Sequence, residues 1–291
     1  GWLAGRDSQG GSGIAIGKSS GRSQQGGGAV AVGQFTGTVG QGTYAVAIGN
    51  QTAQDSQGSN AVAIGSNAGL TSQGNSSVAV GSQSGKTSQG ISSVAIGREA
   101  GNDTQGAQSV AVGLNAGNAT QGTNAVAVGV QAGQTSQATR SVAIGQAAGQ
   151  LSQGTLSVAL GPSAGGTSQG SSSVAIGQSA GEVVQGIQTI AIGRTAGQNN
   201  QVQNGIAIGS YAGLDSQGAY SIAIGRNAAG TNQDSSSIAI GLDASARNQG
   251  GSSIAIGVSA GQDSQGDYGI AIGWHAGKDE QGFKSVAMGW Q

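Results

Sequence analysis

The stretch SVAIGREAGNDTQGAQ, residues 93–108, is followed at once by SVAVG at residues 109–113, where the same pattern begins again. A glycine falls at every sixteenth position from Gly1 to Gly289, without insertion or deletion, so that eighteen units of sixteen residues and three further residues make up the chain. A fixed period of this kind is typical of proteins in which each unit stacks on the next. The sequence predicts one continuous repeat domain over residues 1–291. Since it starts without an initiator methionine or a signal sequence, we expect a fragment of a longer protein.

The composition is that of a repeat or fibrous protein and not of an ordinary globular domain. The chain has 59 glycines, one proline, 3% aromatic and 8% charged residues. Its formal net charge of −1 offers no field to attract nucleic acid, and no segment is apolar for long enough to span a membrane. We therefore expect no nucleic acid partner and no membrane insertion by this segment. The absence of cysteine excludes a disulfide framework.

Each unit reads as one coil of a parallel β-solenoid. The Val94-Ala95-Ile96 segment is short, β-branched and followed by glycine, which favours a strand over a helix. The other half of the unit, residues 100–106, has small residues and two glycines suited to turns around a second short extended segment. The sequence thus predicts an all-β fold of eighteen stacked coils. At the ~4.8 Å spacing of paired strands, they would extend over about 85 Å.

The two faces of the predicted strand differ. Ser93, Ala95 and Gly97 belong to columns that hold only small residues, and the alanine occurs in all eighteen units. Val94 and Ile96 belong to columns of branched residues, with Leu160 and Met288 as the only other types. Thirty-six such side chains left in water would cost ~1.5–3 kcal/mol each, so the stripe is either the coil interior or the seam of an oligomer. We favour the seam, because an outward column has no reason to be alanine eighteen times; its candidate residues are Val94, Ile96, Val110, Val112, Val142 and Ile144.

A glutamine eight residues past each glycine recurs in every unit, as at Gln9, Gln105 and Gln281. Identical amides stacked at strand spacing can hydrogen-bond along the stack. The same short side chain can also close the turn that the following glycine begins. We expect this column to form a structural ladder.

The repeated motif resembles that of a known family. SVAIG at residues 93–97, 141–145 and 173–177 is similar to the motif of the YadA-like head of trimeric autotransporter adhesins, and related repeats occur in phage and large-virus fibre proteins. The resemblance implies a left-handed parallel β-roll in which three chains pack side by side. It also implies an extracellular location, on a cell surface or a virion, and a role in attachment to a host.

Little in the sequence could support catalysis. His275 is the only histidine and there is no cysteine, so a histidine-based metal cluster and a Cys/His pair are both excluded. Aspartates recur two residues before the glutamine, as at Asp103, but threonine, valine, leucine and arginine share that column, which favours a solvated turn over a cation site. We expect neither enzyme activity nor a cofactor or metal.

Aromatic residues gather toward the end of the chain, within two neighbouring units. Stacked aromatic side chains can bind the faces of sugars, which makes this group a candidate ligand surface for a host glycan or protein. Trp2 at the opposite end favours a different role, in which such residues cover the open end of a stack or pack between chains. The residues are Tyr268, Trp274, His275, Phe283 and Trp290.

The sequence thus favours a non-enzymatic surface adhesin head or virion fibre segment, built as a rigid oligomeric rod that displays variable residues on its outer turns. The first alternative is a structural filament or spacer without a ligand. A more remote alternative is a monomeric solenoid that binds ice or cations.

Overall fold

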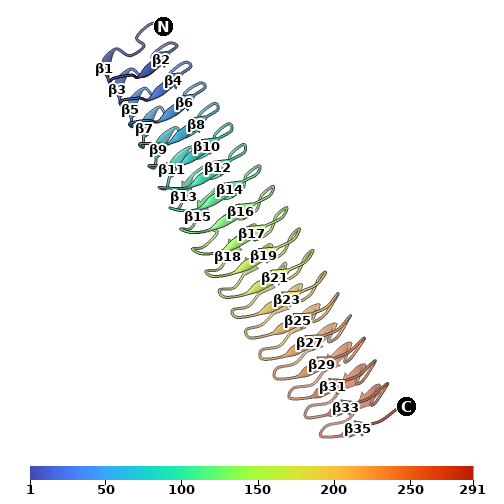
Figure 1. Cartoon of the computed structure of the whole chain (residues 1–291). Coiled ribbons are helices and arrows are strands. Elements are labelled where there is room, and N and C mark those ends of the chain that lie inside the picture. The colour runs from blue at the N-terminus through green and yellow to red at the C-terminus, as the bar shows by residue number, and fades with distance from the viewer. Residues whose placement is uncertain (291) are drawn as a thin grey trace. The chain divides into compact units, whose positions relative to one another are not determined.

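The computed structural model describes residues 1–290, and every helix or strand assigned within them is a β-strand of two or three residues. The chain divides into two compact units, Gly1–Ala147 and Ala148–Gln291. In each unit the strands stack in parallel, one coil every sixteen residues (Figure 1). The predicted all-β parallel solenoid is confirmed.

Each coil contributes one strand of the Val-Ala-Ile type, here called a motif strand. In the first unit these are β2 (Ile14–Ile16), β4 (Val30–Val32), β6 (Val46–Ile48), β8 (Val62–Ile64), β10 (Val78–Val80), β12 (Val94–Ile96), β14 (Val110–Val112), β16 (Val126–Val128) and β17 (Val142–Ile144). In the second unit they are β19 (Val158–Leu160), β21 (Val174–Ile176), β23 (Ile190–Ile192), β25 (Ile206–Ile208), β27 (Ile222–Ile224), β29 (Ile238–Ile240), β31 (Ile254–Ile256), β33 (Ile270–Ile272) and β35 (Val286–Met288).

The second extended segment of a coil ends at the recurrent glutamine and is here called a glutamine strand. In the first unit these are β1 (Asp7–Gln9), β3 (Ser23–Gln25), β5 (Val39–Gln41), β7 (Asp55–Gln57), β9 (Thr71–Gln73), β11 (Thr87–Gln89), β13 (Thr104–Gln105) and β15 (Thr120–Gln121). In the second they are β18 (Ser152–Gln153), β20 (Ser168–Gln169), β22 (Val184–Gln185), β24 (Asn199–Gln201), β26 (Asp215–Gln217), β28 (Thr231–Gln233), β30 (Arg247–Gln249), β32 (Asp263–Gln265) and β34 (Asp279–Gln281).

Neighbouring coils pair in strict register. Val94 lies beside Val110 and Ala95 beside Ala111, so each column of the repeat becomes a row of identical or similar side chains. Backbone hydrogen bonds between coils continue through the turns, for example from Gly97 N to Val80 O at 2.8 Å and from Glu99 N to Ser82 O at 2.9 Å. Coil-to-coil pairing therefore satisfies backbone groups in the turns as well as in the strands.

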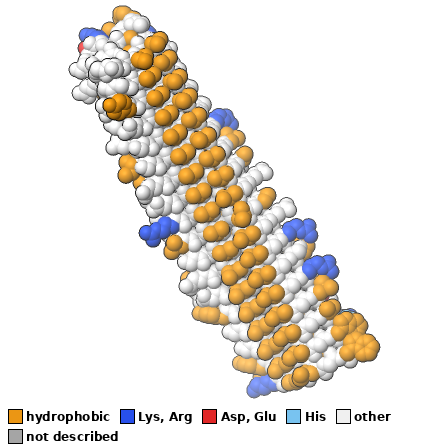
Figure 2. Space-filling view, viewed as in Figure 1, with side chains coloured by type: hydrophobic (Ala, Val, Ile, Leu, Met, Phe, Trp, Pro, Cys, Tyr) orange, Lys and Arg blue, Asp and Glu red, His pale blue; other side chains and the backbone are white. Residues whose placement is uncertain are grey.

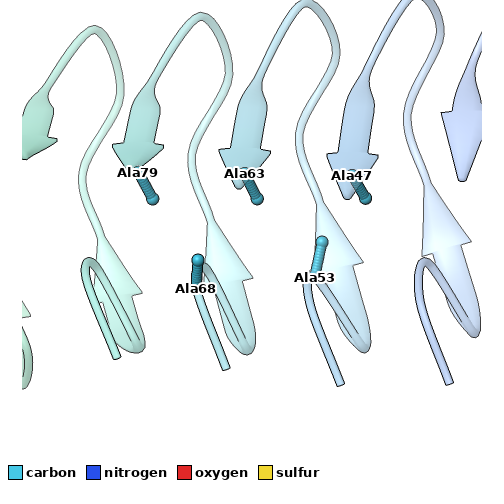
Figure 3. Close-up of a cluster of buried hydrophobic side chains, with 5 residues drawn as sticks. All are labelled: Ala47, Ala53, Ala63, Ala68 and Ala79. Carbon is cyan, nitrogen blue, oxygen red and sulfur yellow. The ribbon is translucent and has the colours of Figure 1, made fainter. Parts of the chain in front are cut away.

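The interior of each coil is filled by small side chains. Every buried hydrophobic residue among residues 1–290 is an alanine, and Ala95 is 0% exposed. Alanines of the motif strands, such as Ala63, point across the coil toward alanines of the facing turn, such as Ala68 (Figure 3). The largest fully buried side chains are glutamines. The structure thus excludes the alternative in which the Val/Ile columns fill the interior.

The recurrent glutamine crosses this interior. Gln105 Nε2 donates to the carbonyl oxygen of Val94, in the motif strand that precedes it along the chain, at 2.8 Å, and also to Oε1 of Gln121 in the next coil at 3.1 Å. Gln9, in contrast, is exposed and donates to Gly13 O at 2.8 Å. Gln281 donates to Ile270 O and Ser285 O, at 2.8 and 3.1 Å. The column therefore links the two strands of a coil as well as successive coils.

Two turn positions of the coil hold residues other than glycine in the left-handed region throughout the described chain, with Gly28 as the exception. Glu99 has a φ of 59° and Gln108 a φ of 56°, and the same columns hold bulky residues such as Tyr211, with a φ of 62°. Residues other than glycine, asparagine and aspartate are uncommon in this region of backbone conformation. Hydrogen bonds between coils offset the cost of this backbone conformation, because the N–H groups of Glu99 and Gln108 each donate to a carbonyl oxygen of the preceding coil at 2.9 Å.

Candidate functional site

The motif strands present an apolar surface, a row of side chains that point away from the interior. We call it the stripe: the first and third residues of every motif strand. Val94 is half-buried and Ile96 is 41% exposed. Figure 2 shows these side chains as two adjacent hydrophobic rows within each unit. The six residues expected at a seam, Val94, Ile96, Val110, Val112, Val142 and Ile144, all lie on it, half-buried or exposed.

Two columns of turn residues border the stripe. The leading column is the residue two positions before each motif strand, such as Tyr220, and the trailing column is the residue two positions after it, such as Arg226. The two columns hold six lysines and arginines and no aspartate or glutamate. The six cations are Lys18, Arg98, Arg140, Arg194, Arg226 and Lys284. The stripe is therefore bordered by positive charge alone.

Most acidic residues lie on the other side of the coil, near the glutamine strands. Asp263 forms an ion pair with Arg247 of the preceding coil at 3.1 Å, and Asp215 accepts a hydrogen bond from the Asn199 side chain. A shallow polar groove beside these strands is lined by Ser216, Asn232 and Asp234, among others. Within residues 1–290, no three histidines, cysteines, aspartates or glutamates come together as metal ligands would.

The five aromatic residues expected to form one ligand surface lie in two clusters. Trp274 stacks on His275 with the ring centroids 3.7 Å apart and lies 5.7 Å from the Trp290 centroid. Tyr268 contacts Phe283 edge to face at 5.8 Å. The first cluster follows β33 and β35, whereas the second precedes them, so the two lie on opposite borders of the stripe.

Cations of the bordering columns pack on aromatic rings of neighbouring coils, a contact the sequence reasoning missed. Lys18 Nζ lies 5.5 Å from the Phe35 ring centroid, and the Arg194 guanidinium lies 4.7 Å from that of Tyr211. Both pairs are seventeen residues apart, one more than the repeat period. A search for cations and rings at separations of sixteen and seventeen residues would have found them, because such residues are neighbours once the coils stack.

Comparison with known proteins supports the resemblance seen in the motif. Residues 121–148 match the YadA head domain repeat in two copies. No curated protein sequence matches the chain. In its repeat and in its parallel β-solenoid fold, the chain is similar to a YadA-like head, as the sequence predicts.

No helix within the described residues has the length and hydropathy required to cross a lipid bilayer.

Proposed function

We propose that the protein is a non-enzymatic head or fibre segment of an extracellular surface adhesin or virion, assembled from parallel copies whose stripes face one another, three in number as in the YadA-like heads. The observation that carries the proposal is the stripe itself, an outward apolar surface that recurs in every coil. The match to the YadA head repeat supports both the assembly and the role in attachment.

Burial of the stripe would supply a large free energy of association. Apolar area removed from water contributes about 25 cal/mol per Å², and a monomer rarely exposes a continuous apolar surface larger than a few hundred Å². The alanine interior cannot accept these side chains, because Ala95 and its counterparts are already fully buried. The stripe of a second copy matches that of the first, coil by coil, since both have the same spacing between coils.

Light scattering coupled to size exclusion tests the assembly. The wild-type chain should elute as an oligomer, and the combined variant Val94→Asp, Ile96→Asp, Val110→Asp should elute as a monomer or precipitate. A matched control places three aspartates in the same region of the chain but away from the stripe, at the exposed or half-buried Asn102, Thr104 and Asn118, and should remain oligomeric. A soluble wild-type monomer would contradict the proposed assembly.

Attachment would use side chains on the outer turns, with avidity from several copies on a multivalent host surface. The aromatic clusters are the candidates: Trp274, His275 and Trp290 on one border of the stripe, Tyr268 and Phe283 on the other. Retention on host cells or on a glycan array should fall when Trp274 and Trp290 are replaced by alanine. If the wild-type oligomer is retained by no such surface, the structural spacer becomes the better interpretation.

A further inference from the structure

The leading and trailing residues of one motif strand lie at opposite ends of that strand. Tyr220 precedes β27 and Arg226 follows it. At ~3.3 Å per extended residue the six steps from Tyr220 to Arg226 span up to about 20 Å, so the two side chains do not touch within one chain. Both side chains are exposed, and the Arg226 guanidinium has no hydrogen bond, ion pair or ring contact with any part of the described chain. Each side chain is thus free to contact a second copy.

At two motif strands a cation and an aromatic ring stand at opposite ends of the strand. None of the eighteen strands has a lysine or arginine at both ends, although six have one. Arginine and tyrosine flank β27, and tryptophan and lysine flank β35, where Trp290 and Lys284 stand at the two ends. Direct apposition of the two columns therefore never opposes like charges, and at these strands it would bring a cation onto a ring.

We propose that each copy of the chain binds a second copy through these two columns, the trailing residue of a strand packing on the leading residue of the same strand in the next copy. The proposal rests on the assembly described under Proposed function. In a cyclic oligomer whose symmetry axis runs parallel to the coil stack, the copies are related by rotation alone, with no shift along the stack. The trailing end of a strand in one copy then meets the leading end of the same strand in the next copy. Arg226 of one copy then lies on Tyr220 of the next. A shift by one coil would instead oppose Arg226 to Asn204 or Ser236, neither of which has a ring.

Crosslinking can locate this contact, because the chain has no cysteine of its own. The double variant Tyr220→Cys, Arg226→Cys is treated with a short bis-maleimide, and Asn204→Cys, Arg226→Cys, which reports a shift of one coil, is treated in parallel. In-register packing predicts covalent oligomers from the first pair and at least several-fold fewer from the second. Equal or greater crosslinking of the shifted pair would overturn the proposal, as would failure of both pairs in a protein that light scattering shows to be oligomeric.

A subunit-exchange measurement gives a second readout that does not depend on cysteine. Arg226→Ala should speed exchange between labelled and unlabelled oligomers by ~2–5-fold, the equivalent of one cation–π contact. Arg22→Ala is the matched control, since Arg22 is exposed but lies just before a glutamine strand, away from the stripe. Equal exchange rates for the two variants would count against the contact. If the wild-type protein is a monomer, the assembly itself fails, which light scattering distinguishes from a failure of register.

Discussion

The side-chain amide of Gln105 donates a hydrogen bond to the backbone carbonyl oxygen of Val94 at 2.8 Å, and so joins the two strands of a coil through its interior. The same bond recurs one coil earlier, from Gln89 to Val78 at 2.8 Å. Among residues 1–290 alanine is the only buried hydrophobic residue type, so apolar packing inside each coil is limited. The hydrogen bond of this fully buried amide, here called the cross-brace, therefore holds the two strands of a coil together where hydrophobic packing is small.

Replacement of Gln105 by leucine tests this role, because it keeps the approximate volume and removes the amide. The variant loses the bond to Val94, removes the second of the two acceptors of the Gln89 amide, and takes away the donor to Gln121 Oε1 at 3.1 Å. Loss of a buried hydrogen bond with unsatisfied partners should lower the free energy of unfolding by about 1–3 kcal/mol, measured by urea denaturation. Gln9→Leu is the control; Gln9 is exposed, and its variant should change stability by less than ~0.5 kcal/mol. Equal effects of the two variants would contradict the cross-brace.

Much of the fold could be predicted because the eighteen units of this one sequence can be compared with one another column by column. The strict alanine at Ala95 identified the inner face, and the Val94 and Ile96 columns identified the outer face. The bond across the coil from Gln105 to Val94 was not predicted, since the sequence does not reveal how far the two strands of a coil stand apart. Nor could it reveal the left-handed φ of Glu99 and Gln108, because their columns hold large and small residues of many types and are not restricted to glycine, asparagine and aspartate.

The surface was less predictable than the interior. The aromatic residues near the end of the chain were expected to form one group, whereas Trp274 and Tyr268 lie on opposite borders of the stripe. Proximity in sequence misleads here, because residues six apart stand at the two ends of a strand while residues sixteen or seventeen apart touch. The contact between Arg194 and Tyr211 follows the second rule.

Enlargement of the inner alanine should destabilise the coil. Ala95 is completely buried, and leucine there must push against the facing turn and the Gln105 side chain. Overpacking of this kind costs roughly 1–3 kcal/mol or more, which a fall in Tm or in the urea midpoint would report. Ala107→Leu is the matched control, because its column already holds Ile91 and Phe283. An Ala95→Leu variant as stable as this control would contradict the prediction, because it would show that the coil interior accommodates a larger side chain.

The glycine that ends each motif strand should be irreplaceable, unlike the glycine four residues later. Gly97 has a φ of +124°, and a Cβ there would lie 2.5 Å from Gly113 O of the next coil. Gly97→Ala should therefore cost at least ~2 kcal/mol of stability through strain and lost coil pairing. Gly101→Ala should cost about 1 kcal/mol or less, because Ala53 occupies that column with a φ of 46°. Hydrogen exchange of the amides around residues 97 and 113 measures the difference, and equal protection in both variants would refute it.

Association through the stripe should respond to salt and temperature as an apolar contact does. The columns that border the stripe contain cations but no carboxylates, so residues of these two columns cannot form ion pairs with one another. Molar salt shortens the Debye length to about 3 Å and screens the remaining repulsion between cations, and cooling weakens hydrophobic association. Analytical ultracentrifugation measures the dissociation constant of the oligomer. This constant should stay the same or fall as the salt concentration rises, and it should increase on cooling to about 4 °C. A tenfold weakening in molar salt would instead indicate that the copies meet through the acidic side of the coil, where Asp263 and Arg247 lie, and would exclude the stripe as the contact.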